Sequence, residues 1–471
     1  MNKISPFIKT TYIIITILIN IHFLYKLMSL NILPIKYILL IILILLFINC
    51  LSIIFIITKK RLLNIIAFII YIILIIVTTI CLKYINKTNT ILETSFSNNN
   101  LEINTYNIIT LKNKYNYINE LNNSKLGYYL NDNINKVINK INQNIDVSLY
   151  KYDDINEIYN DLISNKVDAI LIEESYLDIL NEEYPSINEL ISVIYFFDLT
   201  KKIEKNNNKI EHLNPFNIYI SGSDSRSANL YNKSRSDVNI VLTINPNTRD
   251  ILMTSFPRDY YVSIHNHKGL KDKLTHCGIY GLETSKQTIE DLLNIKIDYS
   301  IKINFNGVIK IVDIVDGVDI YSDQTFYTWV IPEWQVQKGM NHMNGEQALA
   351  YARERHAYAS GDRHRISNQQ QVLEAVLKKA MTNKRLLIKH DDLLTSLNNL
   401  YYTDIPKELI TLLVKEQLNN LKEWKIETNK LDGVGSKQKT YSSPKYLHYV
   451  MIPNEEDIRA SHDRIVNLLN K

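Results

Sequence analysis

Three uninterrupted apolar runs open the chain, and they restrict what it can fold into more than any other feature. The runs at 37–58 and 62–82 are free of charged side chains and long enough to cross a bilayer core of roughly 30 Å as helices. The first run is shorter, and the lysines at its ends, Lys9 and Lys26, can extend to the membrane interface. It lacks the small-residue cleavage site of a signal peptide. Residues 1–83 are therefore predicted to form three transmembrane helices.

Basic residues at the ends of the apolar runs predict the orientation of the chain. Lys3 and Lys9 precede the first run, and residues 59–61 (Lys-Lys-Arg) separate the second from the third. The positive-inside rule places both segments in the cytoplasm, so everything after the third run is expected to be extracellular. We therefore expect a multi-pass protein of the cell membrane. Cys277 is the one cysteine beyond the apolar runs, so the external part has no intrachain disulfide.

The external part divides by composition. Residues 84–100 are polar and Asn-rich, which predicts a linker. Residues 101–205 alternate between strand and helix patterns and predict a small α/β accessory domain with parallel strand pairing, followed by a charged connector. We expect an α/β/α layered catalytic domain with a central mixed sheet at 213–385, and a C-terminal extension packed on it at 386–471.

Local patterns predict the elements of the layered domain. A polar turn, Asn-Pro-Asn-Thr, inside the segment 237–256 indicates a β-hairpin. The segment 276–294 has helical spacing, and Asn344 is a candidate helix cap. The other expected elements are strands at 216–220, 298–304 and 317–322, and helices at 305–315, 344–352 and 363–381.

Arginine is distributed very unevenly. Eight of the twelve arginines lie between Arg226 and Arg365, while lysine supplies most of the positive charge elsewhere. A guanidinium grips phosphate oxygens through two parallel hydrogen bonds, which an ammonium cannot do. Four aspartates are interleaved with these arginines, a mixture suited to phosphate together with a divalent metal: Asp224, Asp237, Asp259 and Asp362. The alternative reading is a set of surface ion pairs, which contribute little individually.

The first candidate segments are SGSDSR and SRSD. In SGSDSR a glycine allows a sharp turn at a strand end, just before Asp224 and Arg226. In SRSD, Arg235 and Asp237 share one face of an extended chain, because alternate residues point the same way. Asp224 and Asp237 are the candidate ligands of Mg²⁺ (or Mn²⁺), which accepts one or two carboxylates plus substrate phosphate. A hairpin salt bridge is the alternative.

A second pair of segments, SFPRDYY and DKLTHCG, adds four candidate features. Arg258 and Asp259 follow a buried strand, and Asp259 is expected to orient an arginine. Lys273 precedes a helix start, where the helix dipole also favours anions. His276 and Cys277 have no partner at a usable spacing, so both are predicted to pack in the interior.

The most informative segment is YARERHAYASGDRHRISNQQQV, at 351–372. If the chain is extended past residue 352, Arg353 and Arg355 project on one face. In the helix that follows, Asp362, Arg365 and Gln369 fall at i, i+3 and i+7 and form one stripe. An adjoining stripe is apolar and is expected to face the core; it contains Val372 and Val376.

Several classes of site are disfavoured. The chain contains no GxxxxGK[ST], GxSxG, HExxH or CxxC pattern, so P-loop, serine-hydrolase and zinc-protease chemistry lack their usual residues. Net charge is only +4, so no general affinity for polyanions follows, and nucleic acid is not an expected partner.

Six separated motifs together resemble the LytR-CpsA-Psr family, over residues 214–382. They are SGSDSR, RSDVNIVLTINP, SFPRDYYV, KLTHCG, GEQALAYARER and GDRHRISNQQ. The resemblance implies a membrane-anchored phosphotransferase. Such an enzyme moves a glycopolymer (teichoic acid, capsule or another wall polysaccharide) from a polyprenyl pyrophosphate carrier to peptidoglycan, next to the membrane lipid.

The resemblance also assigns roles. Asp224, Arg226, Arg258, Arg353 and Arg355 would be catalytic. The chemistry of the displacement, rather than the resemblance, requires a proton acceptor, for which Asp224 and Asp237 are the candidates. The remaining binding residues would be Arg235, Lys273, Arg365 and Gln369, while Asp259 and Asp362 would orient arginines. The apolar interior beside the sheet would hold the lipid tail. A polyprenyl-pyrophosphate hydrolase and a non-catalytic lipid or wall-polymer binder remain as alternatives.

Overall fold

The structure is a computed structural model that describes residues 6–58, 60–97, 101–131, 133–202, 210, 212–223, 230–359, 361–382 and 400–471. The chain forms two compact units. One comprises residues 1–98, 207–213 and 405–423, and the other comprises residues 99–206, 214–404 and 424–471.

The first unit contains the three apolar helices α1 (Pro6–Ser29), α2 (Ile35–Ile57) and α3 (Arg61–Ser97), with α14 (Lys407–Asn419). All three N-terminal helices are long and apolar enough to span a membrane. Lys9 of α1 donates a hydrogen bond to the carbonyl of Ile56 in α2 (3.0 Å), and Lys36 of α2 donates one to the carbonyl of Asn419 in α14 (2.9 Å). The three helices predicted from the apolar runs are present.

The predicted linker at 84–100 is wrong for residues 84–97, because α3 continues through them. Polar composition does not end this helix. Ile91 is buried, so an apolar contact face persists beyond the long apolar run. Asn89 also donates to Glu93 one turn further on (2.9 Å), which supports the helical conformation.

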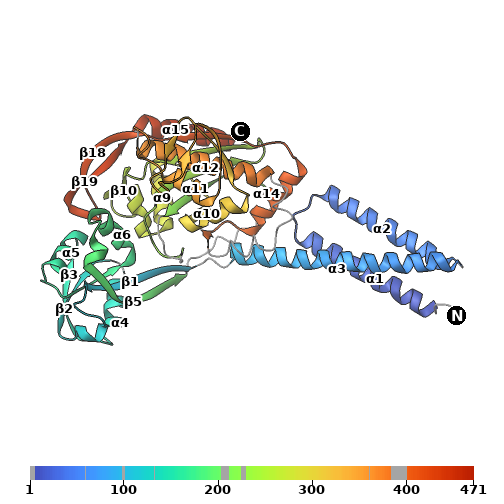
Figure 1. Cartoon of the computed structure of the whole chain (residues 1–471), viewed down its shortest axis with the longest axis horizontal. Coiled ribbons are helices and arrows are strands. Elements are labelled where there is room, and N and C mark those ends of the chain that lie inside the picture. The colour runs from blue at the N-terminus through green and yellow to red at the C-terminus, as the bar shows by residue number, and fades with distance from the viewer. Residues whose placement is uncertain are drawn as a thin grey trace. The chain divides into compact units, whose positions relative to one another are not determined.

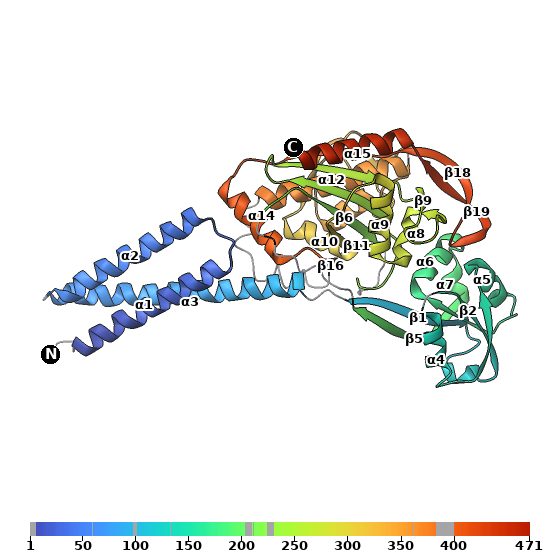
Figure 2. The same cartoon turned by 180° about the vertical axis from the view of Figure 1, so that it is seen from behind.

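In the second unit, residues 101–202 form the accessory domain, a five-stranded sheet in the order β3-β2-β4-β1-β5. Strands β2, β4 and β3 run parallel, whereas β1 pairs antiparallel with both β4 and β5, so the sheet is mixed rather than parallel. Figures 1 and 2 show the elements in teal and green. The strands are β1 (Leu101–Leu111), β2 (Ser124–Tyr129), β3 (Val147–Tyr152), β4 (Ala169–Glu173) and β5 (Ile191–Lys202). The helices are η1 (Ile118–Leu121), α4 (Ile134–Ile141), α5 (Ile155–Ile163), α6 (Glu174–Glu183) and α7 (Ile187–Leu190).

The rest of the second unit is built on a six-stranded mixed sheet in the order β16-β11-β6-β7-β8-β17. The pairs β11–β6 and β8–β17 are parallel, and the other neighbours are antiparallel. Every residue of β6 is buried, as expected for a strand covered on both faces. The strands are β6 (Phe216–Ser223), β7 (Val238–Asn245), β8 (Asp250–Phe256), β11 (Tyr299–Asn304), β16 (Tyr401–Thr403) and β17 (Lys425–Lys430).

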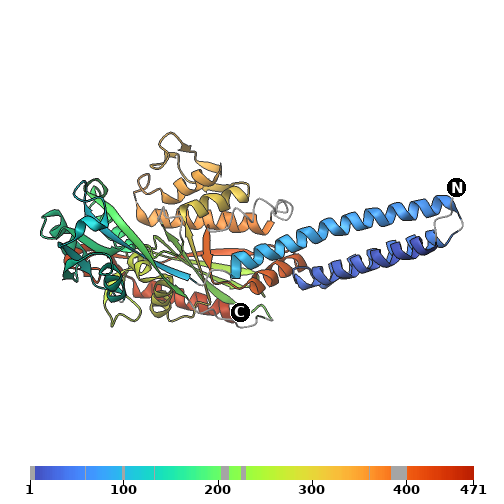
Figure 3. The same cartoon turned by 90° about the horizontal axis from the view of Figure 1, so that it is seen from below.

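Helices cover both faces of this sheet, as the predicted α/β/α layering requires (Figure 3). One face carries α9 (Leu282–Leu293) and α15 (Glu455–Asn470), and the other carries α10 (Phe305–Ile314), α11 (Gly345–Arg353) and α12 (Asp362–Thr382). The side-chain amide of Gln370 fastens α12 to the sheet by donating to the carbonyls of Met253 in β8 (3.4 Å) and Asn429 in β17 (2.7 Å). Asn344 caps α11 through a capping box with Gln347, as predicted from the sequence.

Short elements complete the layered domain. The paired strands are β9 (Tyr261–Ser263) with β10 (Lys271–Lys273), β12 (Val318–Ser322) with β15 (Gly339–Met343), β13 (Phe326–Tyr327) with β14 (Gln335–Val336), and β18 (Gly433–Thr440) with β19 (Ser443–Pro453). The predicted helix at 276–294 is interrupted at Gly281, whose φ of 125° is incompatible with a helix. The short helices α8 (Leu274–Cys277) and η2 (Gly278–Tyr280) precede this glycine, and α9 begins directly after it.

The described part of the predicted C-terminal extension contributes directly to the central sheet. It supplies the edge strands β16 and β17 and the covering helix α15, whose Ile465 is fully buried. The predicted domain boundary at residue 385 therefore separates strands that belong to one continuous sheet. Helix α14, by contrast, belongs to the unit of the apolar helices.

Candidate active site

A cavity of about 480 Å³ lies between the central sheet and helices α10 to α12. Its volume is that of a typical small-molecule pocket. Much of its wall is apolar and comes from both the sheet and the helices: Ile220, Ile240, Ile301, Ile303, Val308 and Leu373. Seven of the charged or polar residues singled out in the sequence also line it: Arg235, Asp237, Arg258, Arg353, Arg355, Arg365 and Gln369. The structure thus joins a cationic surface to an apolar one in a single cavity.

Asp237 and Arg258 meet because β7 and β8 pair as a hairpin, with Asp237 just before β7 and Arg258 just after β8. Arg258 Nη1 donates to Asp237 Oδ1 (2.9 Å), and Thr275 Oγ1 donates to the same oxygen (3.3 Å). Burial alone would raise the pKa of Asp237, but the charges of Arg235, Arg258 and Arg365 outweigh burial and lower it. Asp237 is therefore held as a carboxylate among cations.

Asp259 lies on the other side of Arg258. Its carboxylate is 3.8 Å from Arg258 Nε and 3.6 Å from Lys273 Nζ. Burial raises the pKa of Asp259 despite these two cations. Burial disfavours the charged form of Arg258, but Asp237, Asp259 and Asp362 together raise its pKa. Arg258 is therefore hydrogen-bonded to Asp237 and lies near a second carboxylate, that of Asp259.

Helix α12 presents Arg365 and Gln369 to the cavity from successive turns. Asp362, in the first turn, forms an ion pair with Arg365 at 2.9 Å. Arg365 Nε is buried and makes no hydrogen bond to any described residue. Val372 and Val376, predicted to face the core, line the apolar part of the same cavity.

Arg353 and Arg355 also line the cavity, but not as alternate residues of an extended chain. Helix α11 continues to Arg353, whose guanidinium lies 4.4 Å from the ring centroid of Phe305. The chain becomes extended only at Glu354, where the helix ends. The buried Glu354 carboxylate then accepts backbone N–H bonds from Arg355, His356 and Ala357 through one oxygen. Glu354 thus fixes the turn that carries Arg355, directly after the helix end that carries Arg353, a role that the sequence did not suggest.

Gly222 is required for a different reason from the one predicted. It lies within the extended, buried strand β6, and a Cβ at this position would come within 2.7 Å of Val238 Cβ on β7. The glycine therefore permits close approach of two strands at the cavity wall. Asp224 and Arg226, which follow it, lie outside the described residues.

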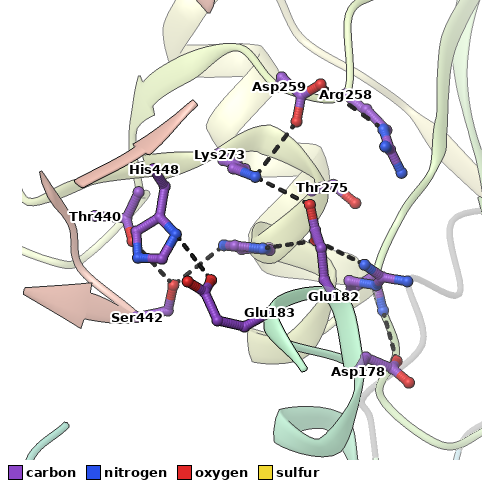
Figure 4. Close-up of polar contacts among 12 residues, drawn as sticks. Asp178, Glu182, Glu183, Arg258, Asp259, Lys273, Thr275, Thr440, Ser442 and His448 are labelled. Atoms are coloured by element: carbon purple, nitrogen blue, oxygen red, sulfur yellow. Dashed lines mark hydrogen bonds and ion pairs between the residues drawn. The ribbon is translucent and has the colours of Figure 1, made fainter. Parts of the chain in front are cut away.

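Lys273, a predicted substrate-binding residue, is not among the residues that line the cavity. Its ammonium is nearly buried and lies 3.1 Å from Glu182 Oε1 (Figure 4). Glu182 belongs to α6 of the accessory domain and lines the cavity together with its neighbour Asn181. The other oxygen, Oε2, accepts from Arg235 Nη1 (2.7 Å). Sequence reasoning found no catalytic residue in the accessory domain, so it missed Glu182.

His276 lies in the interior, as predicted, but it has polar and charged partners there that the sequence spacing did not suggest. Its Nδ1 is 2.7 Å from Asp272 Oδ1 and 3.1 Å from Ser442 Oγ, and its Nε2 is 3.8 Å from Glu182 Oε2. Burial would lower the pKa of His276, but Asp272 and Glu182 raise it to about 9. His276 is therefore a buried cation at neutral pH. Cys277 does pack in the interior, and burial raises the pKa of its thiol.

The ionised His276 predicts a pH dependence of stability. Because its pKa in the folded protein is above the ordinary value of 6.5, its ion pairs with Asp272 and Glu182 stabilise the fold fully below about pH 6.5. This contribution is lost as pH rises through about 9. We expect the melting temperature to fall between pH 7 and 9.5, and to fall less steeply in His276→Asn. Parallel curves for the two proteins, recorded by circular dichroism, would contradict this assignment.

Metal ligands are limited among the described residues. They contain no group of three or more His, Cys, Asp or Glu side chains that could hold an ion. Of the predicted pair, Asp237 is described and lines the cavity, whereas Asp224 lies outside the described residues.

Comparison with known proteins identifies relatives of the chain. The model of the LytR_cpsA_psr family matches residues 194–456, more than half of the chain. A Bacillus cereus protein named polyisoprenyl-teichoic acid–peptidoglycan teichoic acid transferase TagU is 34% identical over 214 residues, covering 45% of this chain and 68% of the relative. The TagU protein of Bacillus anthracis is 31% identical over 243 residues, covering 51% and 77%. The crystal structure of B. subtilis TagV, 26% identical, superposes with a TM-score of 0.46 and covers 55% of this chain and 98% of TagV.

The family match covers the central sheet and the segments that supply Arg235, Arg258 and Arg365, but not Asn181 and Glu182 of the cavity wall. The sequence motifs and the family model agree over this region. The protein is a member of the LytR_cpsA_psr family.

Proposed function

We propose that this protein is a membrane-anchored phosphotransferase that moves a wall glycopolymer from a polyprenyl pyrophosphate carrier to peptidoglycan. The names of its relatives support a teichoic acid as the polymer. The proposed partners are the lipid-linked glycan, peptidoglycan and the membrane lipid, and the proposed cofactor is Mg²⁺ (or Mn²⁺).

The observation that carries the proposal is the dual character of the cavity. Its arginines offer bidentate donors to a pyrophosphate, and its apolar wall continues directly from them between the sheet and α12. An amphiphile with a diphosphate head and a hydrocarbon tail matches both surfaces, whereas a free nucleotide or sugar phosphate would leave the apolar wall unused.

The reaction requires an acceptor hydroxyl of peptidoglycan to attack the phosphorus that bears the glycan. A new P–O bond forms, the bond from that phosphorus to the bridging oxygen breaks, and polyprenyl phosphate leaves as the hydroxyl loses its proton. Negative charge builds on the phosphoryl and bridging oxygens during this step. Arg258, Arg353, Arg355 and Arg365 line the cavity and would stabilise that charge without a protein nucleophile.

Asp237 is suited to holding a cation rather than to accepting a proton. Its lowered pKa makes it a weak base, and it lies at the cavity wall beside Arg258. One carboxylate plus phosphate oxygens is a common arrangement for Mg²⁺, so the residues present fit this ion. A bound Mg²⁺ would supply Lewis-acid neutralisation of the diphosphate. We assign proton acceptance to Asp224 and metal binding to Asp237 with Asp224.

The apolar helices are proposed to anchor the enzyme with its layered domain outside the cell. Basic residues before the first run and between the second and third favour the cytoplasm, which leaves the rest of the chain extracellular. The cavity would then lie on the extracellular side of the membrane, where it could meet lipid-linked wall precursors.

A transfer assay tests the function directly. Full-length protein in detergent would be incubated with a polyprenyl-pyrophosphate glycan, Mg²⁺ and peptidoglycan oligomers, and the products separated by mass spectrometry. A covalent glycan–peptidoglycan phosphodiester with one polyprenyl phosphate per bond formed is the expected result. Polyprenyl phosphate without conjugate would establish the hydrolase instead, and bound but unreacted lipid would establish the non-catalytic binder.

The apolar wall yields a separate prediction about chain length. Leu373 on α12 lines the cavity one turn beyond Gln369, so Leu373→Trp should fill the space assigned to the tail. We expect affinity for long polyprenyl pyrophosphates to fall about tenfold or more, while affinity for isopentenyl pyrophosphate stays within about twofold. Titration of both ligands against the same variant provides its own control. An equal loss for both would show that the tail lies elsewhere.

A further inference from the structure

Helix α6 of the accessory domain reaches the cavity. Asp178, Asn181 and Glu182 lie at i, i+3 and i+4, so they share one face of this helix, while Ile179 and Leu180 are buried in the accessory core. Asn181 and Glu182 line the cavity, and Asp178 accepts a long backbone N–H bond from Arg235 (3.5 Å). The accessory domain therefore forms part of the cavity wall.

Glu182 gathers three cations that come from two segments of the layered domain. Arg235 precedes β7, Lys273 ends β10 and His276 lies in α8. The contacts are Nη1 of Arg235 to Oε2 at 2.7 Å, Nζ of Lys273 to Oε1 at 3.1 Å, and Nε2 of His276 to Oε2 at 3.8 Å (Figure 4). Both carboxylate oxygens are thus engaged by the layered domain.

The electrostatics of Glu182 fit a permanent charge. Burial would raise its pKa, but His276, Lys273 and Arg235 lower it well below the ordinary range. Arg235 is only 9% exposed, so its long side chain has few alternative positions once Glu182 holds Nη1. A buried guanidinium that binds phosphate needs such a fixed partner, because loose placement weakens a bidentate contact.

We propose that Glu182 is a positioning residue of the pyrophosphate site and that it acts through Arg235. The accessory domain is then a structural component of that site rather than an independent appendage. This inference rests on the proposed function, because it takes a diphosphate as the ligand.

The alternative role for Glu182 is competition with the substrate. Glu182 could instead occupy the phosphate position as an internal anion that the substrate must displace. The two roles predict opposite signs: removing the charge weakens diphosphate binding if Glu182 positions Arg235, and strengthens it if Glu182 competes with the ligand.

The test compares two neighbouring glutamates in the full-length protein. Glu182→Gln should weaken binding of farnesyl diphosphate about tenfold, and should leave binding of farnesol, which has the same tail, unchanged. Glu183→Gln is the matched control: Glu183 pairs with His448 of β19 at 3.1 Å across the same contact between the domains, and does not line the cavity. We expect wild-type affinity for both ligands in that variant. Unchanged or tighter farnesyl diphosphate binding by Glu182→Gln would overturn the proposal.

A double-mutant cycle tests the route through Arg235. In an Arg235→Gln background, Glu182→Gln should add less than about a twofold further loss, because the group that it positions is gone. Independent, multiplying losses would refute the positioning role. If Glu182→Gln does not melt cooperatively, Glu182→Asp replaces it in the test. This variant retracts the carboxylate by one methylene and should weaken binding of farnesyl diphosphate about threefold. Binding as tight as that of the wild type would contradict the proposal.

The outcome is distinguishable from failure of the proposed function. If wild-type protein binds neither farnesyl diphosphate nor a longer polyprenyl diphosphate, the function fails. If wild type binds and Glu182→Gln binds equally well, only the inference about Glu182 fails.

Discussion

Replacing Arg258 by lysine should reduce glycan transfer about a hundredfold or more while preserving the net charge. Arg258 donates to Asp237 at 2.9 Å, approaches Asp259 at 3.8 Å and still lines the cavity. The planar guanidinium of arginine carries several N–H donors in fixed directions, which can serve carboxylates and a phosphate at once. The ammonium of lysine has no such planar arrangement of donors. Loss of one preorganised donor to developing charge typically costs about 10²–10³ in turnover. Initial rates with saturating lipid-linked glycan provide the measurement.

Arg363→Lys is the control for this substitution. Arg363 also lies in the first turns of α12, but it is exposed, pairs with Asp432 at 2.8 Å and does not line the cavity. The rate of glycan transfer by Arg363→Lys should stay within about twofold of that of the wild type, since exposed ion pairs contribute little. Comparable rates for Arg258→Lys and wild type would remove the case for a bidentate arginine at this position.

Asp237→Asn is expected to lower turnover about a hundredfold and to raise the Mg²⁺ concentration needed for half-maximal rate about tenfold. The substitution removes a charge that faces Arg235, Arg258 and Arg365, and it removes a proposed metal ligand. Changes close to a metal typically cost about 10–100-fold in metal affinity. The rate would be measured across a Mg²⁺ titration, with calorimetry of Mg²⁺ binding in the presence of pyrophosphate.

The surface carboxylate Asp319 provides the comparison. It belongs to β12 and pairs with Lys379 at 3.1 Å, outside the cavity. Asp319→Asn should leave the Mg²⁺ titration unchanged. A normal titration in Asp237→Asn would instead assign the metal to other groups and leave Asp237 with the single role of holding Arg258.

Much of the fold was predictable because its elements are locally encoded. The apolar runs, the 237–256 hairpin and the Asn344 cap each depend on residues close together in the sequence, and each is present. Helix α3 extends further than expected because a buried residue, Ile91, continues its contact face into a polar segment. Similarly, β16 and β17 join the sheet through pairings with strands far away in the chain, which local patterns do not reveal.

The accessory contribution to the site was not predicted, although one signal was available. Asp178 and Glu182 repeat a negative charge one helical turn apart, an arrangement that destabilises an isolated helix. Such a pair is less unfavourable when a cationic partner from elsewhere in the fold lies beside it. Nothing in the sequence identifies that partner, because Arg235 and Lys273 lie dozens of residues away.

The apolar helices, the layered α/β class and the cluster of arginine and aspartate candidates could all be predicted without coordinates. This was possible because periodicity, capping and side-chain chemistry are local properties. Which charges face the cavity depends on the tertiary structure. Arg353 and Arg365 lie along its wall, whereas Lys273 is paired with Glu182. His276 is buried among carboxylates that raise its pKa. The physical reason is that burial and ion pairing depend on which distant segments the sheet and helices bring within a few ångströms.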